Sequence, residues 1–473
     1  MRFLLLALVS LLAACPLPQP SQSIPQPQAL AFTNVTVIDA TGAPARASQT
    51  VVVIGDRIHA VGHTDRIQIP RGARRIDAEG MYLIPGLWDS HVHLSFAEAG
   101  AEQLLPVFLA NGVTSLRDAG GNMGVALLRD RVARGEVIGP RILMAGPLIE
   151  GAQWLRAVEE VFGMEGEVGR MLRHVFEIAP RVPLGTPEEA FPLADSLMRL
   201  GVDFIKVRNV HGATYTALAE ATERLGIPLA AHTPRGLGLA EAGAGTDSFE
   251  HTETITFALG SRSETERREA MALLARDSVI VVPTVVTALT FRGGQGQAAA
   301  IIQDTLDQLD PRRRYLPPPV LEHWRAALAL TELEPPMDWE THLRREMADL
   351  RLLHEAGVIL LAGSDFGGVP LIFPGFSVHE ELQLLVEHAG MTPLEALQTA
   401  TRNPPIFFGM QAELGTIQPG RVADLVLLRA DPLSDIRNTQ QIQAVVSGGR
   451  FFDRADLDAL LASGEARSTP VSP

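Results

Sequence analysis

The sequence predicts an α/β protein in which a (β/α)8 TIM barrel carries a small β-sandwich-like domain built from both chain ends. Eight short apolar segments alternate with helical segments through the middle of the chain. Polar side chains stand near the ends of five of the apolar segments, and β-branched runs occur near both termini. A chain of 473 residues with 46% hydrophobic residues is long enough to bury the core of such a barrel.

The first residues have the pattern of an export signal. Residues 1–14 carry Arg2, an apolar run too short to span a bilayer, and small residues before Cys15. The segment LAAC that ends at Cys15 resembles the bacterial lipobox, so we expect a lipoprotein signal peptide and a lipid anchor on this cysteine. Residues 15–29, rich in Pro and Gln, would be a tether. The expected location is the bacterial cell envelope, although a cysteine in a disordered tail is the alternative.

Composition excludes several other classes of protein. The net charge is −15 and no basic block occurs, which argues against nucleic acid as a partner because phosphate binding needs clustered cations. The single cysteine excludes a disulfide within the chain and a cysteine-rich zinc site. Neither the charge nor the composition predicts an oligomeric state.

Short β-branched runs at the two chain ends predict one small sheet. AFTNVTVIDATG and TVVVIGDRIHAVG lie near the N-terminus, with Gly55-Asp56 as a hairpin turn, and VADLVLL and IQAVVSGGRFF lie near the C-terminus. Neither pair is large enough to be stable alone. We therefore expect residues 30–84 and 411–455 to form the small domain, followed by a C-terminal tail over 456–473.

Residues 85–410 are expected to form most of the barrel. Most of the apolar segments are nearly continuous, as in parallel strands that are buried on both faces. The expected strands are 83–94, 113–120, 141–149, 203–209, 228–234, 247–253, 279–286 and 357–365. The clearest helices between them are 188–200, 212–226, 265–277 and 340–356. Two long connections, 150–202 and 287–356, would lie at the C-terminal mouth and contribute a lid or a substrate pocket.

Six polar side chains lie near the C-terminal ends of predicted strands, where barrel active sites are built. They are His91 and His93 on strand one, Lys206 on strand four, His232 on strand five, His251 on strand six and Asp365 on strand eight. Unpaired polar groups are costly in a core, so packing does not explain the set. Four imidazoles and a carboxylate suit zinc or a similar divalent ion.

The same segments resemble the amidohydrolase superfamily of metal-dependent hydrolases. The matching pieces are PGLWDSHVHL, FIKV, AHTP, FEHTE, GSDFG and LGTIQPGRVADLVLL, together with MTPLEALQTATRNPPIFFGM after the barrel. The resemblance extends from residue 31 to about residue 452. It implies a hydrolase with two divalent metal ions, most simply zinc.

The resemblance also implies a role for each of the six residues. The two histidines of the HVH segment would bind the more buried metal, and His232 and His251 would bind the second. Lys206, carboxylated by carbon dioxide on its ε-nitrogen, would bridge both metals. Asp365 would bind the first metal and act as general base.

Lys206 is the single lysine among 40 Lys and Arg residues. A carbamate forms on a neutral amine, and burial lowers the pKa of a lysine toward that state. Arginine stays protonated and cannot replace it. The alternative is an ordinary ion-paired lysine.

Arg208 is a candidate for substrate binding. It lies two residues after Lys206 and would share its face in an ideal strand. It would either clamp a substrate carboxylate or form a structural ion pair, for instance with Asp118 at the end of strand two.

The segments VDFIKVRN and TRNPPIFFGM are similar to those of prolidase-like amidohydrolases, which implies hydrolysis of an amide C–N bond in Xaa-Pro-like dipeptides or N-acyl amino acids. One alternative is a cyclic amidase or an imidazolonepropionase-like hydrolase. The latter type uses one metal and lacks the bridging lysine, so Lys206 argues against it. A non-catalytic lipoprotein that binds metal or solute is the other alternative, and Asp365 argues against it because capture needs no general base.

Overall fold

The structure is a computed structural model that describes residues 29–465 apart from 163–168, 170–172, 174 and 332–336. The predicted signal peptide, Cys15 and all but the last residue of the tether lie outside the described residues. Within the described part, no helix is both long enough and apolar enough to cross a membrane.

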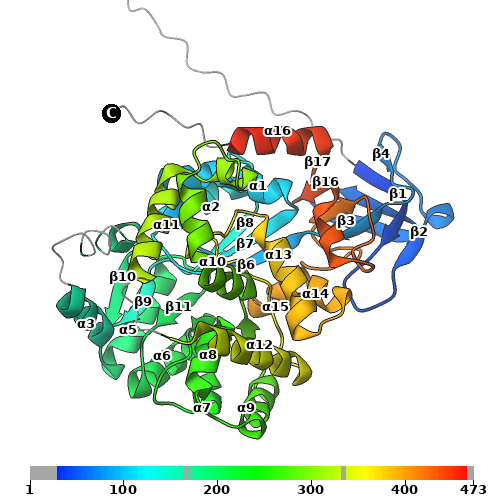
Figure 1. Cartoon of the computed structure of the whole chain (residues 1–473). Coiled ribbons are helices and arrows are strands. Elements are labelled where there is room, and N and C mark those ends of the chain that lie inside the picture. The colour runs from blue at the N-terminus through cyan, green and yellow to red at the C-terminus, as the bar shows by residue number, and fades with distance from the viewer. Residues whose placement is uncertain (1–28, 163–168, 170–172, 174, 332–336, 466–473) are drawn as a thin grey trace, which may run out of the picture.

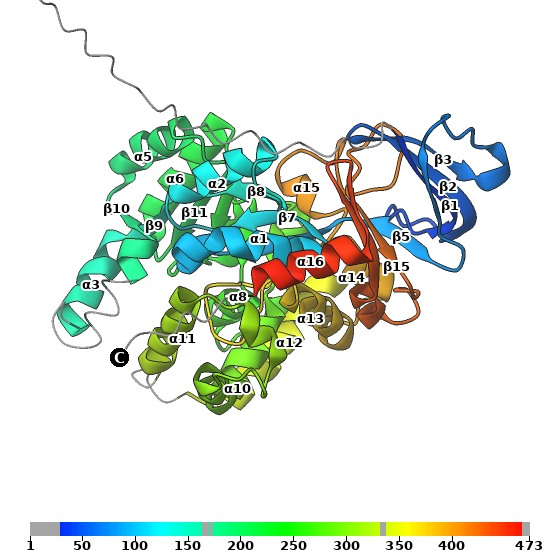
Figure 2. The same cartoon turned by 90° about the horizontal axis from the view of Figure 1, so that it is seen from above.

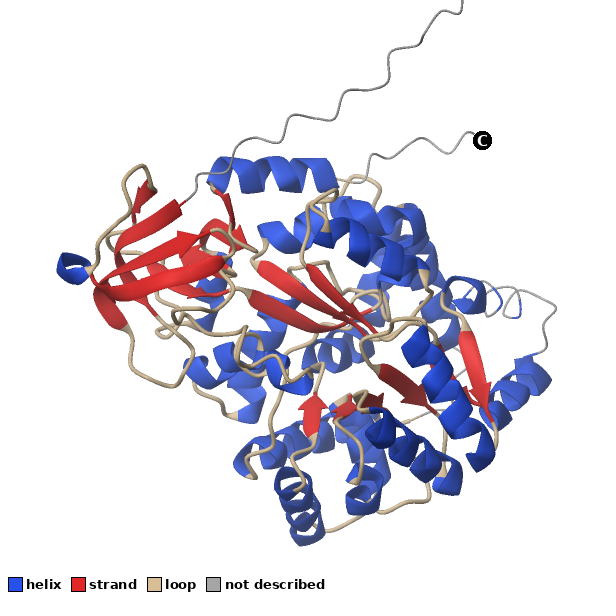
Figure 3. Ribbon diagram, turned by 180° about the vertical axis from the view of Figure 1, so that it is seen from behind, coloured by secondary structure: helices blue, strands red, loops and turns tan. Residues whose placement is uncertain are grey.

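Strands from both chain ends share one sheet, which lies to one side of the barrel (Figures 1 and 3). The strand order is β17-β16-β15-β5-β1-β2-β3, and β4 pairs with β1. The bounds are β1 (Ala29–Val37), β2 (Arg46–Ile54), β3 (Arg57–His63), β4 (Arg74–Asp77), β5 (Tyr82–Pro85), β15 (Leu425–Leu428), β16 (Ile442–Ser447) and β17 (Arg450–Phe452). The β2–β3 hairpin turns at the predicted Gly55-Asp56, where Gly55 has a φ of 59° that suits glycine.

Parallel strands form a closed ring in the middle of the chain. β6 pairs with β7 and β7 with β8, while β11, β12, β13 and β14 pair in sequence order. The amide of Asp203 donates to the carbonyl of Met144 and joins β8 to β11. The eighth segment closes the ring because Leu360 bridges β14 and Phe366 bridges β6. The predicted (β/α)8 barrel with a small β domain is therefore confirmed.

The barrel strands are short, and each continues as irregular backbone toward the mouth of the barrel. Their bounds are β6 (Leu87–Val92), β7 (Val113–Asp118), β8 (Arg141–Met144), β11 (Ile205–Arg208), β12 (Leu229–Ala231), β13 (Ser248–Glu250) and β14 (Ile280–Val282). Strand side chains that face the helices, such as Ile205, Val207 and Phe249, pack with helix side chains in the largest hydrophobic cluster of the described residues. Side chains on the other face of the strands, such as Phe204, Ala230 and Val282, form a separate small cluster with Phe407.

Two of the predicted strands are each divided in two. The expected strand 83–94 supplies β5 to the small sheet and β6 to the barrel, with Gly86 between them, where a Cβ would lie 2.2 Å from Thr114 Oγ1. The expected strand 141–149 becomes β8 and β9 (Leu148–Gly151). Gly146 has a φ of 68° at this break, and Pro147 has no amide hydrogen for a ladder.

Helices surround the barrel (Figure 3). The four helices named from the sequence are present within one residue of the expected bounds as α5 (Pro187–Arg199), α6 (Gly212–Leu225), α9 (Glu264–Arg276) and α12 (Trp339–Glu355). The other α-helices in the described part of the chain are α1 (Ala101–Ala110), α2 (Gly124–Ala133), α3 (Ala152–Phe162), α7 (Leu239–Gly243), α8 (Thr252–Leu259), α10 (Val285–Gln303), α11 (Pro318–Thr331), α13 (Ser377–Leu384), α14 (Pro393–Thr399), α15 (Pro404–Phe407) and α16 (Arg454–Gly464).

The expected C-terminal tail starts inside helix α16. Asp453 caps this helix in a box with Asp456, and the helix lies along α1 (Figures 1 and 2). Leu457 is fully buried in the main core. Residues 466–473 of the expected tail lie outside the described part.

The packing of α16 predicts a stability effect. Leu457→Ala should lower the free energy of unfolding by about 2–5 kcal/mol, because it removes buried methyl groups and leaves a cavity. Urea or thermal unfolding measures the change. Asp458→Ala on the same helix is the control, because this side chain is 65% exposed and should leave the midpoint unchanged. An equal midpoint in both variants would contradict the docking of α16.

Candidate metal centre and catalytic cavity

A cavity of about 1030 Å³ opens at the C-terminal ends of the barrel strands. All six predicted site residues line it, namely His91, His93, Lys206, His232, His251 and Asp365. Both long connections also contribute to its wall, as expected. Trp154 and Arg181 come from the first connection, and Thr287 and His323 from the second.

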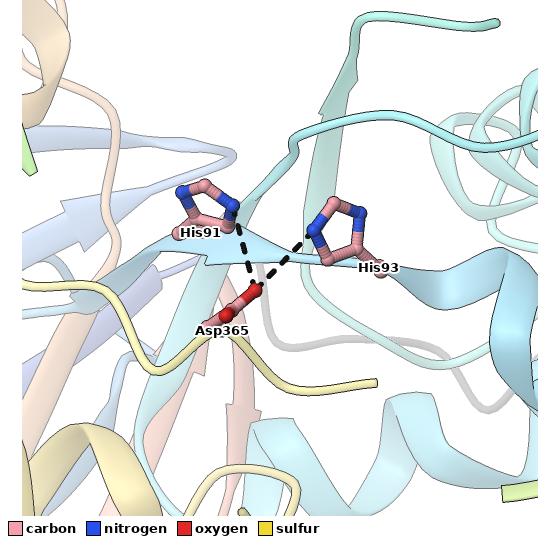
Figure 4. Close-up of side chains that lie close together, drawn as sticks. All are labelled: His91, His93 and Asp365. Atoms are coloured by element: carbon pink, nitrogen blue, oxygen red, sulfur yellow. Dashed lines mark ion pairs between the residues drawn. The ribbon is translucent and has the colours of Figure 1, made fainter. Parts of the chain in front are cut away.

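His91, His93 and Asp365 form a group of possible metal ligands among the described residues (Figure 4). Asp365 Oδ1 lies 3.5 Å from His91 Nε2 and 3.3 Å from His93 Nε2. One donor atom from each residue lies within 4.8 Å of the others, so one ion could contact all three.

The outer ring nitrogens of these two histidines are held by hydrogen bonds. His93 Nδ1 lies 2.8 Å from the carbonyl oxygen of Gly120, and His91 Nδ1 lies 2.6 Å from Glu250 Oε2. If Nδ1 donates in each case, the lone pair of Nε2 faces the cavity, as in protein metal sites. His91 Nε2 is buried and has no hydrogen-bond partner in the described part of the chain.

The remaining three residues stand beside this group. The His251 ring centroid lies 4.7 Å from that of His91 and 4.9 Å from that of His232, so the imidazoles form a continuous row. His251 Nδ1 is held 2.7 Å from Thr284 Oγ1. Lys206 is 1% exposed, and its Nζ has no hydrogen-bond partner among the described residues. The carboxylate oxygen Oε2 of Glu250 lies 4.0 Å from Nζ, at ion-pair distance.

Burial sets the protonation states that metal binding requires. Desolvation lowers the pKa of His91 to about 4 and that of His251 to about 3, and it lowers the pKa of His232 well below its ordinary value. These imidazoles are therefore neutral at pH 7. Desolvation also lowers the pKa of Lys206 to about 7. Burial raises the pKa of Asp365, but the hydrogen bond with His93 and the nearby histidines outweigh it and hold this pKa below its ordinary value.

The backbone at three strand ends is held in the left-handed region. The φ angles are 66° at His251, 50° at Thr284 and 59° at Asp365, all of them non-glycine residues. Such conformations cost free energy and persist where surrounding contacts fix them. The amide of Asp365 donates to the carbonyl of His91 at 2.7 Å. Gly363 leaves room for this approach, because a Cβ there would lie 2.8 Å from His91 Cβ.

Glu250 and Arg117 form a buried ion pair next to the site, and neither residue was predicted from the sequence. Arg117 donates to both carboxylate oxygens of Glu250, at 3.0 and 3.1 Å, and to Ser248 Oγ at 2.9 Å. Its guanidinium carbon lies 4.5 Å from the Phe204 ring centroid and 4.2 Å from that of Phe407. Both charged side chains are fully buried. A charged residue inside an apolar strand was the available signal.

Asp89 is a second unpredicted support. Its carboxylate accepts hydrogen bonds from the Ser364 hydroxyl at 2.6 Å and the Ser364 amide at 2.8 Å. It thereby ties the first barrel strand to the residue before Asp365. Burial raises the pKa of Asp89 to about 7. Its spacing of two residues from His91 was the signal in the sequence.

Arg208 lies at the cavity but has a different partner from the one expected. It pairs with Glu150, with the Arg208 Nη2 atom 3.0 Å from Glu150 Oε2. Asp118 instead accepts the amides of Leu94 and Gly120. The suggested Arg208–Asp118 pair is therefore wrong, because β9 enters between these parts of the barrel and supplies Glu150.

Comparisons with known proteins agree with this geometry. The model of the Amidohydrolase family matches residues 82–452. The chain is 26% identical to the ochratoxinase of Aspergillus niger over 413 residues, which cover 78% of this chain and 75% of that enzyme. It is 26% identical to the imidazolonepropionase of Symbiobacterium thermophilum over 379 residues, which cover 79% of this chain and 81% of that enzyme.

A solved structure has the same architecture. The crystal structure of a provisionally assigned prolidase from Bifidobacterium longum matches with a TM-score of 0.67 and 26% identity. The match covers 93% of this chain and 100% of that chain. The likeness therefore extends over the small domain as well as the barrel.

The buried pair under the site predicts a large stability effect. Arg117→Met should destabilise the protein by about 3–5 kcal/mol, because it leaves the Glu250 carboxylate buried without its cation. Adding Glu250→Gln should recover part of the loss, since the unpaired charge is then removed. Urea unfolding measures both. The control is Arg131→Met, which breaks a surface pair with Glu102 and should leave the midpoint unchanged. Equal losses of unfolding free energy in Arg117→Met and Arg131→Met would contradict the structural role of Arg117.

Proposed function

The chain belongs to the amidohydrolase family and is a hydrolase that acts on amide bonds, and from this premise we propose a more specific function. The enzyme uses two metal ions to hydrolyse the amide C–N bond of Xaa-Pro-like dipeptides or of N-acyl amino acids. The observation that carries the proposal is the position of Lys206. The one lysine of the chain is buried beside four histidines and a carboxylate, in the same cavity.

The donor set fits two divalent ions. Neutral imidazoles and carboxylates are ligands that zinc accepts, and the buried His91 Nε2 and Lys206 Nζ atoms have no hydrogen-bond partner in the described part. His91, His93 and Asp365 would hold one ion, and His232 and His251 the other. When bound, such ions supply a Lewis acid for the carbonyl and lower the pKa of a water molecule.

Lys206 would join the two halves of the site as a carbamate. Its neutral amine attacks carbon dioxide, a C–N bond forms, and one proton is released to solvent. The product is an anion with two oxygens, which is suited to bridging two cations. Burial favours the neutral amine that this reaction needs, because the pKa of Lys206 is lowered to about 7.

Asp365 is the group placed to move protons. Its carboxylate faces the cavity and stays ionised because its pKa lies below the ordinary value. In the proposed reaction it orients the attacking water, accepts a proton from it and passes that proton to the leaving nitrogen. Phe96 and Leu148 supply apolar wall beside these polar groups.

The substrate class rests on similarity and on the size of the cavity. The prolidase and ochratoxinase relatives support amide hydrolysis, and a volume of about 1030 Å³ accommodates a dipeptide-sized molecule. The second candidate is an imidazolonepropionase-like hydrolase of a cyclic amide, which the relative from Symbiobacterium thermophilum favours. The two readings differ in the role of Lys206 and therefore in metal content.

Metal content tests the bridged site. Protein lacking residues 1–15 should carry about two metals per chain by mass spectrometry, and Lys206→Arg should carry one or fewer because arginine forms no carbamate. His63→Gln, an exposed histidine of β3, is the control and should keep the wild-type content. One metal in both wild type and Lys206→Arg would contradict the bridge and favour mononuclear chemistry.

Turnover tests the role of Asp365. Asp365→Asn should retain much of the metal and lose activity by at least about 100-fold, because the amide cannot accept the proton. The assay is a panel of dipeptides, N-acyl amino acids, lactones and hydantoins. Near-normal turnover in this variant would rule out Asp365 as the base. Wild-type protein that is inactive on the whole panel would instead favour the binding lipoprotein.

A further inference from the structure

Arg181 is a buried cation that the proposed reaction does not use. It is the first residue of β10 (Arg181–Leu184) and lines the same cavity as the six site residues. Its side chain is 7% exposed. The Nε and Nη1 atoms are buried and have no hydrogen-bond partner among the described residues. Buried donors of a charged group are costly to leave unpaired, so this guanidinium is suited to an incoming acceptor.

The nearby carboxylate of Glu150 is already engaged by other groups. Arg208 donates to Glu150 Oε2 through Nε at 3.3 Å and through Nη2 at 3.0 Å. Asn209 donates to Glu150 Oε1 at 2.8 Å. Arg181 Nε is 3.9 Å from Oε2, which is an ion-pair distance but too long for a hydrogen bond. Two guanidinium groups thus share one carboxylate, so the three side chains together carry a net positive charge.

The surroundings favour an anion at this place. Aromatic rings lie beside both cations, with the Arg181 guanidinium carbon 5.8 Å from the Phe176 ring centroid and the Arg208 guanidinium carbon 5.9 Å from that of Trp154. Ion pairs are stronger in such a low-dielectric setting than in water. Arg235 also lines the cavity, but it is exposed, so solvent can satisfy its donors without a protein or substrate partner.

The strand register sets the distance between this cluster and the hydrolytic site. On β11, Arg208 lies two residues beyond Lys206, which is roughly 7 Å along the strand. Glu150 pairs with Arg208 across the sheet, and Arg181 lies on the neighbouring strand on the far side of β9. A C-terminal carboxylate is one residue from the amide that is cut, or roughly 4 Å. A long arginine side chain can span the remaining distance between its strand and the substrate carboxylate.

We propose that Arg181 is a specificity-determining residue that binds the α-carboxylate of the residue released from the C-terminal side of the substrate. The guanidinium donates to the carboxylate oxygens, while Glu150 keeps Arg208 in place beside it. This inference rests on the proposed function, because it assigns the substrate's free carboxylate to a site in the same cavity. It predicts that the enzyme prefers a free carboxylate over a neutral end.

The test compares matched substrates in matched variants. Each N-acyl amino acid is assayed together with its carboxamide. Arg181→Gln should lower kcat/KM for the carboxylate by about 100-fold, chiefly through KM, and change the carboxamide by less than about threefold. Arg181→Lys should restore part of the preference because it returns the charge. Arg156→Gln on α3 is the control, since this arginine is exposed and does not line the cavity.

Calorimetry gives a second readout that does not depend on turnover. Non-hydrolysable phosphonyl amino acids and their carboxamides are titrated into wild type and Arg181→Gln. Binding of the carboxylate that weakens about 100-fold in the variant supports the proposal even if no substrate is hydrolysed, in which case only the proposed function fails. Equal weakening of both ligands would make Arg181 structural and overturn the proposal. Absence of any preference for carboxylate in the wild type would also overturn it.

Discussion

The buried pair of Arg117 and Glu250 is the interaction on which the site most depends. It joins β7 to β13 through the barrel interior, and Glu250 also holds the outer nitrogen of His91. Phe407, which follows the barrel in sequence, closes over the guanidinium together with Phe204. Ion pairs without water on any side need such complete satisfaction to be tolerated. The orientation of His91 is therefore coupled, through Glu250 and Arg117, to the packing of Phe204 and Phe407.

The barrel was predictable because its signals are local. Apolar runs of strand length alternate with amphipathic helices, and the helices named from the sequence, such as 212–226, differ from the structure by one residue. The breaks at Gly86 and Pro147 were missed, since an apolar run continues through both. The sheet that each half of a divided strand joins depends on pairing with strands that lie far away in the sequence. Helix α16 was missed because its stability depends on packing against α1 and the strands β16 and β17, which lie far from it or in another element of the chain.

The residues of the site also include some that the sequence predicts and some that it does not. His232 and Asp365 stood out because polar groups at the ends of apolar strands are unusual, and the structure brings all six predicted residues to one cavity. The partners of charged groups were not predictable. Arg208 was expected near Asp118, but strand β9, which forms after a glycine and a proline, brings Glu150 to it instead. Arg181 has no sequence signal, because an arginine at a strand start is ordinary until its surroundings are known.

The shared sheet has a consequence for the order in which the chain folds. β5 precedes the first barrel strand by one residue, yet it pairs with β15, which is synthesised more than 300 residues later. During synthesis the N-terminal strands therefore expose an unpaired edge until nearly the whole chain has emerged. Such an edge is a site for wrong pairing between nascent chains. The C-terminal strands thus cover the open edge of β5 late in folding. A chain shortened before these strands would leave a completed barrel attached to an incomplete sheet that is prone to aggregation.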